Sequence, residues 1–402
     1  MSAVEGDASE ARDAGRGLRS VGARARGVGE AVLVAAVPIL LALIANGILI
    51  AAIGRDPFSF YADMADRGLI QWQGLQESLI HSSPLLLIAA GLIVAFRANL
   101  WNLGADGQFL LAAAFTAGFA PTLLDAFGIW PMLIATMVIA AIVGGAWTII
   151  PAFLRGRYGV NEIITTLMMS FIGIGVANVL VKGPFRTDVG GVARTDTVPF
   201  DERFPLLFGT RIHFGFVIGI VAILAVHLLM TRTSLGLRLR ILGANPRAAL
   251  HAGLNPVRLT IVAFVISGAL VGLAGSVEIL GVQGGFRADF NPAYGLLVIP
   301  LVFLARLNAI GSLVLVIAFS AVLIGGQSAA REQEITSDIM LLLVGLILLF
   351  MAVTEYLRVR WGGRMRFLTP ELAERLRPGE PERAPEEARP PIGAGEVGEA
   401  GR

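Results

Sequence analysis

The sequence predicts an all-α polytopic membrane protein with about ten transmembrane helices. Hydrophobic residues make up 55% of the 402 residues and charged residues only 15%, and the mean hydropathy is +0.73. Soluble domains are considerably less apolar. The apolar residues also gather in runs near the roughly 20 residues that a helix needs to cross the hydrocarbon core. Charged or turn-forming breaks separate these runs, so the chain is expected to cross the bilayer repeatedly.

Ten runs qualify as candidate spans. They cover residues 30–53, 79–96, 108–124, 131–154, 163–181, 214–230, 259–280, 292–305, 310–324 and 339–356. The eighth is shorter than a full span. The first is too long for a signal-peptide core of about 7 to 15 apolar residues, so it is expected to remain as a membrane anchor.

These spans form a predicted membrane domain, residues 30–357, between two polar ends. Residues 1–29 are an arginine-rich cytoplasmic N-terminus, and residues 358–402 contain too few apolar side chains to bury a core and are expected to form a disordered tail. The positive-inside rule and an even number of spans predict that both termini lie in the cytoplasm. Segment 182–213 then falls outside although it carries five basic residues, which conflicts with that rule.

Several function classes are excluded or disfavoured. The chain has no cysteine and four scattered histidines, so neither a thiolate site nor a zinc-ligand spacing occurs. A net charge of +2 gives no reason to expect a nucleic-acid partner. The chain lacks a Gly-x-x-x-x-Gly-Lys-Ser/Thr loop, so it is not expected to hydrolyse ATP or to bind a cofactor. An ion-driven transporter or a membrane-embedded enzyme would need acidic residues or clustered histidines at membrane depth, and these are scarce.

A polar, glycine-containing block at residues 96–108 interrupts the apolar runs. Its candidate functional residues are Asn102, Gly104, Asp106, Gly107 and Gln108. Such a block frees backbone groups that lipid cannot satisfy, so it either lines an aqueous pathway or is an ordinary cytoplasmic turn. Its first four residues, Phe-Arg-Ala-Asn, resemble Phe-Arg-Ala-Asp at 286–289, five spans later. The match indicates either an inverted five-plus-five repeat or a coincidence.

Two further blocks have local explanations. Asn161 is expected to cap the fifth span, and Glu162 complements the positive end of its dipole. Residues 245–253 are expected to form a short helix capped by Asn245, with Pro246 in its first turn and Gly253 at its end. Flanking arginines suit this helix either to docking a soluble partner or to lying at the membrane surface.

Glu278 is a rare ionisable residue near the outer end of a span. We expect it either to contact a polar solute or hold an outer gate, or to pair with Arg287.

Taken in this order, the blocks resemble the permease subunits of nucleoside-type ABC importers, within the group that includes simple-sugar and branched-chain amino-acid permeases. The resemblance covers residues 84–353 and is most specific at 102–108, 159–166, 243–249 and 267–275. The chain differs in having Asp106 where the family usually has Glu, and Ala-Arg-Leu-Asn-Ala-Ile-Gly at 305–311 where the family has a Gly-Arg-x-Asn-Pro-x-Gly turn.

The resemblance implies a type II-like importer in the cytoplasmic membrane, with nucleosides as cargo and sugars or branched-chain amino acids as the alternative. It implies a second similar permease, an extracytoplasmic substrate-binding lipoprotein and a separate ATP-binding subunit that supplies the energy. Residues 102–108 and Glu278 would lie on the translocation pathway. The residues that would couple it to the ATPase are Asn245, Pro246, Arg247, Ala248, Ala249 and Gly253.

Overall fold

The computed structural model describes residues 36–187, 191–336 and 338–360. The chain divides into two units, Met1–Thr354 and Glu355–Arg402, and the contacts described below belong to the first. The predicted N-terminus, 1–29, lies outside the described residues, as does the predicted tail beyond Arg360.

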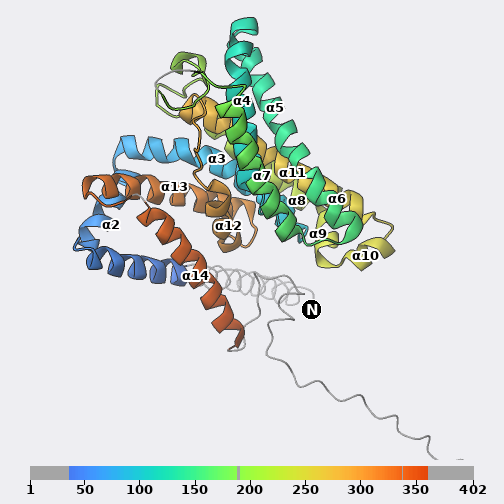
Figure 1. Ribbon diagram of the computed structural model, residues 1–402. Coiled ribbons are helices and arrows are strands. Elements are labelled where there is room, and N and C mark those ends of the chain that lie inside the picture. The colour runs from blue at the N-terminus through green and yellow to red at the C-terminus, as the bar shows by residue number, and fades with distance from the viewer. Residues whose placement is uncertain (1–35, 188–190, 337, 361–402) are drawn as a thin grey trace, which may run out of the picture. The chain divides into compact units, whose positions relative to one another are not determined.

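The described residues are mostly helical (Figure 1). After a helix at Ala36–Ala52, the elements are α2 (Pro57–Ala65), the π-helical turn η1 (Asp66–Ile70), α3 (Trp72–Arg97), α4 (Ala105–Phe127), α5 (Ile129–Trp147), α6 (Ile149–Tyr158), α7 (Glu162–Lys182), the 3-10 turn η2 (Phe200–Glu202), α8 (Gly215–Arg232), α9 (Ser234–Ala244), α10 (Pro246–His251), α11 (Pro256–Val277), the π-helical turn η3 (Glu278–Gln283), α12 (Tyr294–Leu304), α13 (Ala309–Glu332) and α14 (Ile339–Arg360).

Seven segments of the described chain are long and apolar enough to cross a membrane. They are α3, α4, α5 with α6, α7, α8, α11 with η3, and α13. The other three predicted spans coincide with shorter apolar helices, Ala36–Ala52, Tyr294–Leu304 and Ile339–Thr354. The helical polytopic class is confirmed, whereas the number of ten spans stays a prediction. The sequence interpretation missed α2, the π-helical turns and α9, which lie between the apolar runs.

Helix α3 is the most enclosed span of the described chain, and residues 82–96 are buried on every face. It packs against α8, α11, α12 and α13. A helix that is apolar all round is expected at the centre of a bundle. Pro84 lies within it and cannot donate a backbone hydrogen bond to Ile80. The Ser83 hydroxyl donates to the Ile80 carbonyl oxygen instead, at 2.5 Å.

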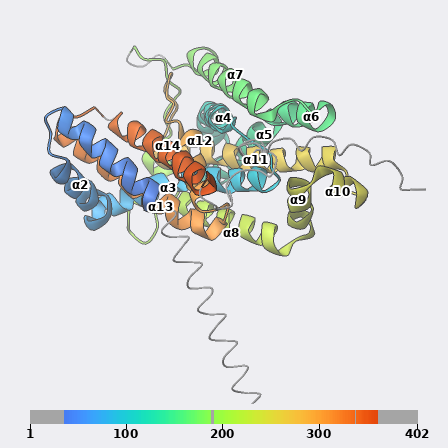
Figure 2. The same cartoon turned by 90° about the horizontal axis from the view of Figure 1, so that it is seen from below.

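Helices α5 and α11 approach each other closely through glycines. A Cβ atom at Gly272 of α11 would overlap the Ala140 carbonyl oxygen of α5, and one at Gly144 of α5 would overlap the Gly268 carbonyl oxygen of α11. Small residues allow helix backbones to approach in this way in membranes. Helix α11 packs on α5, and α3 packs on α13 (Figures 1 and 2).

Candidate functional site

The block at residues 96–108, across the break between α3 and α4, is buried, and its polar groups hydrogen-bond to one another. The Asn102 amide donates to Gln108 Oε1 at 3.1 Å and to Ser267 Oγ of α11 at 3.0 Å. Its Oδ1 atom accepts from Gly104 N at 3.2 Å and from Gln108 Nε2 at 2.9 Å. All of the ordinary hydrogen-bonding positions of Asn102 are thus filled within the protein.

The first turn of α4 extends this junction to two more helices. Asp106 Oδ1 accepts from Gly295 N of α12 at 2.6 Å, and Gly107 N donates to Ser170 Oγ of α7 at 3.0 Å. Both Asp106 and Gly107 are buried. The block is therefore a junction of α4, α7, α11 and α12 and not a solvent-exposed turn.

The two resembling stretches end in similar turns, although Phe96 and Arg97 belong to α3 whereas Phe286 and Arg287 lie outside a helix. Asn99 and Asp289 end them with positive φ values of 57° and 61°. A few residues later, Asn102 Oδ1 accepts from Gly104 N, and Asn291 Oδ1 accepts from Ala293 N at 3.0 Å. Helices α4 and α12 then begin at the next residue. The likeness therefore includes backbone geometry as well as four letters of sequence.

The turn between α12 and α13 departs from the family pattern but is ordered by specific contacts. Arg306 and Leu307 both have positive φ values, 54° and 56°. The Arg97 guanidinium donates to the Leu307 carbonyl oxygen from Nε at 3.1 Å and from Nη2 at 2.9 Å. Asn308 then caps α13 by accepting from Ile310 N at 3.0 Å. Arg97, in the block at residues 96–108, thereby stabilises the turn at residues 305–311, whose sequence departs from the family pattern.

Glu278 is fully buried in η3 and does not pair with Arg287. Its Oε1 atom accepts from Gln283 Nε2 at 3.0 Å, and its Oε2 atom has no hydrogen-bond partner within the described part of the chain. A five-residue spacing suits π-helical winding, which brings residues i and i+5 together. Arg287 is exposed and lines a cavity instead. The alternative of a Glu278–Arg287 pair is therefore wrong.

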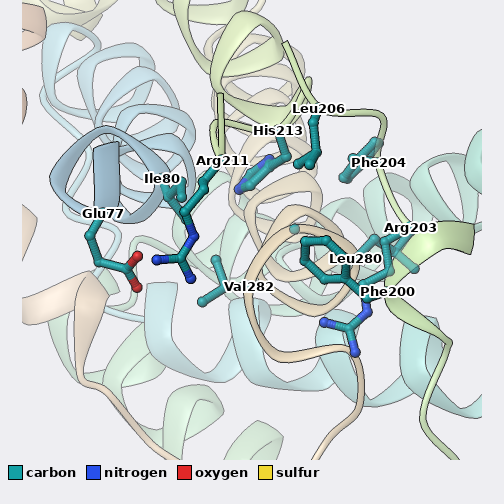
Figure 3. A pocket seen from close by; sticks show the side chains of 11 residues that line it. Glu77, Ile80, Phe200, Arg203, Phe204, Leu206, Arg211, His213, Leu280 and Val282 are labelled. Atoms are coloured by element: carbon teal, nitrogen blue, oxygen red, sulfur yellow. The ribbon is translucent and has the colours of Figure 1, made fainter. Parts of the chain in front are cut away.

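A cavity of about 100 Å³ lies where the segment between α7 and α8 meets α3 and η3 (Figure 3). Glu77, Arg203, Arg211 and His213 give it its polar groups. His213 Nδ1 accepts from Gly215 N at 3.1 Å, which assigns the ring proton to Nε2. Burial lowers the pKa of His213 to about 4, and the nearby His81 contributes to the decrease. The imidazole is therefore neutral near pH 7.

A larger cavity, of about 620 Å³, lies beside Gln283 at the C-terminal end of η3. Three arginines, two glutamines, two threonines and two phenylalanines contribute to its walls. They are Arg194, Arg287, Arg331, Gln283, Gln327, Thr195, Thr197, Phe286 and Phe290. Sequence reasoning did not find this cavity because its walls come from three segments far apart in the chain.

The predicted coupling helix is present as α10. Asn245 Oδ1 accepts from Arg247 N at 2.9 Å and from Ala248 N at 3.1 Å, which confirms the cap. The helix ends before Gly253, whose φ is +74°. There Gly253 N donates to the Leu250 carbonyl and Leu254 N to the Ala249 carbonyl, each at 3.0 Å. This pair of bonds is a Schellman motif, so α10 is closed at both ends.

The block before α7 is also ordered as the sequence predicts. Asn161 Oδ1 accepts from Ile163 N at 2.9 Å, so Asn161 caps α7. Glu162 is buried and pairs with Arg155 of α6 at 3.2 Å. One turn later, Thr166 Oγ1 accepts from Leu103 N at 3.2 Å. The second block thus contacts the first, a proximity that the sequence did not predict.

Apolar helices that are long enough to span a bilayer, and that are interrupted by buried polar breaks, define a membrane transport protein. The chain belongs to the family described as "branched-chain amino acid transport system / permease component", whose model matches residues 74–352. The resemblance found in the sequence is thereby confirmed.

Curated relatives cover most of the chain but differ in their named cargo. The glucose ABC transporter permease protein of Haloferax volcanii is 31% identical over 80% of this chain and 87% of its own length. The nucleoside ABC transporter permease protein of Lactococcus lactis is 28% identical over 82% and 92%. The guanosine ABC transporter permease protein of Bacillus subtilis is 26% identical over 82% and 96%. No solved structure matches the chain significantly.

Proposed function

We propose that this chain is the membrane-spanning subunit of an ABC importer that carries nucleosides across the cytoplasmic membrane. The observation that supports nucleosides best is the larger cavity, whose phenylalanines and polar side chains suit a solute with an aromatic base and a polar sugar. Two relatives named for nucleosides or guanosine support the same cargo. The more identical glucose relative supports sugars as the second candidate.

The energy would come from a separate ATP-binding subunit docked on α10. The pathway would run beside the 102–108 junction and past Glu278, between this permease and a second similar one. A lipoprotein would deliver the solute from outside. The similar turns at Asn99 and Asp289 support an inverted repeat, whose halves would rock against each other during alternating access.

Orientation can be tested by cysteine labelling, because the chain has no natural cysteine. Phe208 is 97% exposed in the segment predicted to lie outside, and Leu250 is 62% exposed on α10. In intact cells, a membrane-impermeant maleimide is expected to label Phe208→Cys and not Leu250→Cys. Both variants should react after permeabilisation. The opposite pattern in intact cells would reverse the proposed topology and put α10 out of reach of an ATPase.

Cargo can be tested by uptake in membranes that contain the complete transporter. Labelled guanosine should accumulate only when this chain, its ATPase and its binding protein are all present. Unlabelled nucleosides should compete, and glucose in hundredfold excess should not. Glucose uptake that nucleosides leave unchanged would overturn the nucleoside proposal and favour the sugar alternative.

A further inference from the structure

The larger cavity presents an unusual set of hydrogen-bonding groups. Arg194, Arg287 and Arg331 line it, and no carboxylate lies within 4.0 Å of their guanidinium groups among the described residues. Guanidinium groups are donors only. These three side chains would therefore bind acceptor groups of a solute.

Backbone pairing fixes two of these arginines beside each other. Arg194 and Arg287 form an antiparallel bridge. Next to it, Thr195 N donates to the Phe286 carbonyl oxygen at 3.0 Å, and Phe286 N donates to Thr195 Oγ1 at 3.0 Å. Phe290 is half-buried in the same wall and packs edge-on against Phe286, with ring centroids 6.0 Å apart. The cavity wall thus carries two arginines on paired backbone segments together with an aromatic side chain.

Gln283 connects the cavity wall to a buried carboxylate that does not itself line the cavity. Gln283 lines the cavity and donates to Oε1 of the fully buried Glu278, whose Oε2 has no partner in the described chain. A buried acceptor without a donor is costly. Hydroxyl groups of a solute that displaced the Gln283 amide would donate hydrogen bonds to both carboxylate oxygens of Glu278. Arginine donors therefore line the cavity, and a carboxylate acceptor lies behind Gln283.

We propose that the cavity and Glu278 form one two-ended site for purine nucleosides with a 6-oxo group, base outward and ribose inward. Arginine binds the O6 and N7 acceptors of guanine with two parallel hydrogen bonds, and Phe290 provides a ring for the base to pack on. The ribose hydroxyls donate to Glu278. Cytosine lacks the O6–N7 edge, and glucose has no aromatic end. This inference rests on the proposed import function and specifies its cargo.

The test measures uptake of guanosine, 7-deazaguanosine and cytidine by the complete transporter in proteoliposomes. For each nucleoside, uptake by a variant is divided by uptake by wild type. The selectivity of the binding protein is the same in both and cancels in this ratio. Arg287→Gln and Arg287→Lys are expected to lower guanosine uptake about tenfold, the order expected for loss of a two-bond base contact. Cytidine uptake should change less than twofold, which also shows that the variants fold. Wild-type uptake of 7-deazaguanosine should be reduced, and the Arg287 variants should not reduce it further.

Glu278→Gln tests the inner end and Arg211→Gln is the matched control. Glu278→Gln is expected to slow guanosine uptake more than 2′,3′-dideoxyguanosine uptake, because only guanosine has the 2′- and 3′-hydroxyls. Arg211 lines the smaller cavity (Figure 3), and its replacement should preserve the guanosine-to-cytidine ratio. Equal effects of Arg287→Gln on guanosine and cytidine would overturn the two-ended site while nucleoside import stood. Uptake of glucose and of no nucleoside would overturn the proposed import of nucleosides and the two-ended site together.

Discussion

Replacing Ala249 by proline is expected to abolish uptake while the protein still inserts in the membrane. Ala249 is fully buried in α10, and its N–H donates to the Asn245 carbonyl oxygen at 3.0 Å. Proline removes that donor and costs roughly 3 kcal/mol or more inside a helix. That energy corresponds to about a hundredfold fall in the helical population, and α10 has only six residues over which to compensate.

The measurement is substrate-stimulated ATP hydrolysis together with uptake by the reconstituted transporter. Both should fall in Ala249→Pro, whereas Ala249→Ser keeps the N–H and a small side chain and should remain close to wild type. Membrane levels of the two variants should be equal, because the spans do not depend on this loop. Normal uptake and stimulation in Ala249→Pro would mean that α10 is only a surface helix.

Gly272→Leu is expected to cause a large loss of stability. A side chain at Gly272 would collide with the α5 backbone at Ala140, and backbone atoms cannot move aside as a flexible side chain can. Overpacking of a tight interior typically costs about 1 to 3 kcal/mol, and this contact is expected to lie at the upper end. The α5–α11 interface supports the junction because α11 carries Ser267, which bonds Asn102.

Thermal unfolding of the purified protein in detergent measures this effect. Gly175→Leu in α7 is the matched control, because a Cβ atom there meets nothing within 4 Å. Glycine is a poor helix former and leucine a good one, so the control should melt at or above the wild-type temperature. Gly272→Leu should melt several degrees lower or fail to accumulate. Equal melting temperatures of Gly272→Leu and wild type would contradict the described packing of α5 on α11.

Helix caps were predictable from the sequence, whereas hydrogen bonds between residues far apart in the chain were not. The caps at Asn161 and Asn245 depend on groups two or three residues away, so their identity and spacing were sufficient. The partner of Asn102 on α11 lies 165 residues away, and nothing in the local pattern specifies it. The sequence therefore singled out the first block, but the junction in which its polar side chains bond to one another and to α11 was not predictable.

Glu278 illustrates a different limit. The expected alternative paired it with Arg287 by charge, but π-helical winding brings Gln283 to it instead. The winding of one turn is set by tertiary packing and is not visible in hydropathy. The arginine-lined cavity was missed for the same reason, because residues 194, 287 and 331 meet only after folding.

This chain is expected to move solute with energy from ATP hydrolysed by a partner. The most direct test is guanosine accumulation in proteoliposomes that contain the complete transporter, with ATP supplied to the ATPase side and ionophores present to collapse ion gradients. Accumulation should require ATP, be unaffected by ionophores and disappear when this chain is omitted. Accumulation that persists without ATP and stops when ionophores are added would contradict it and identify an ion-driven transporter.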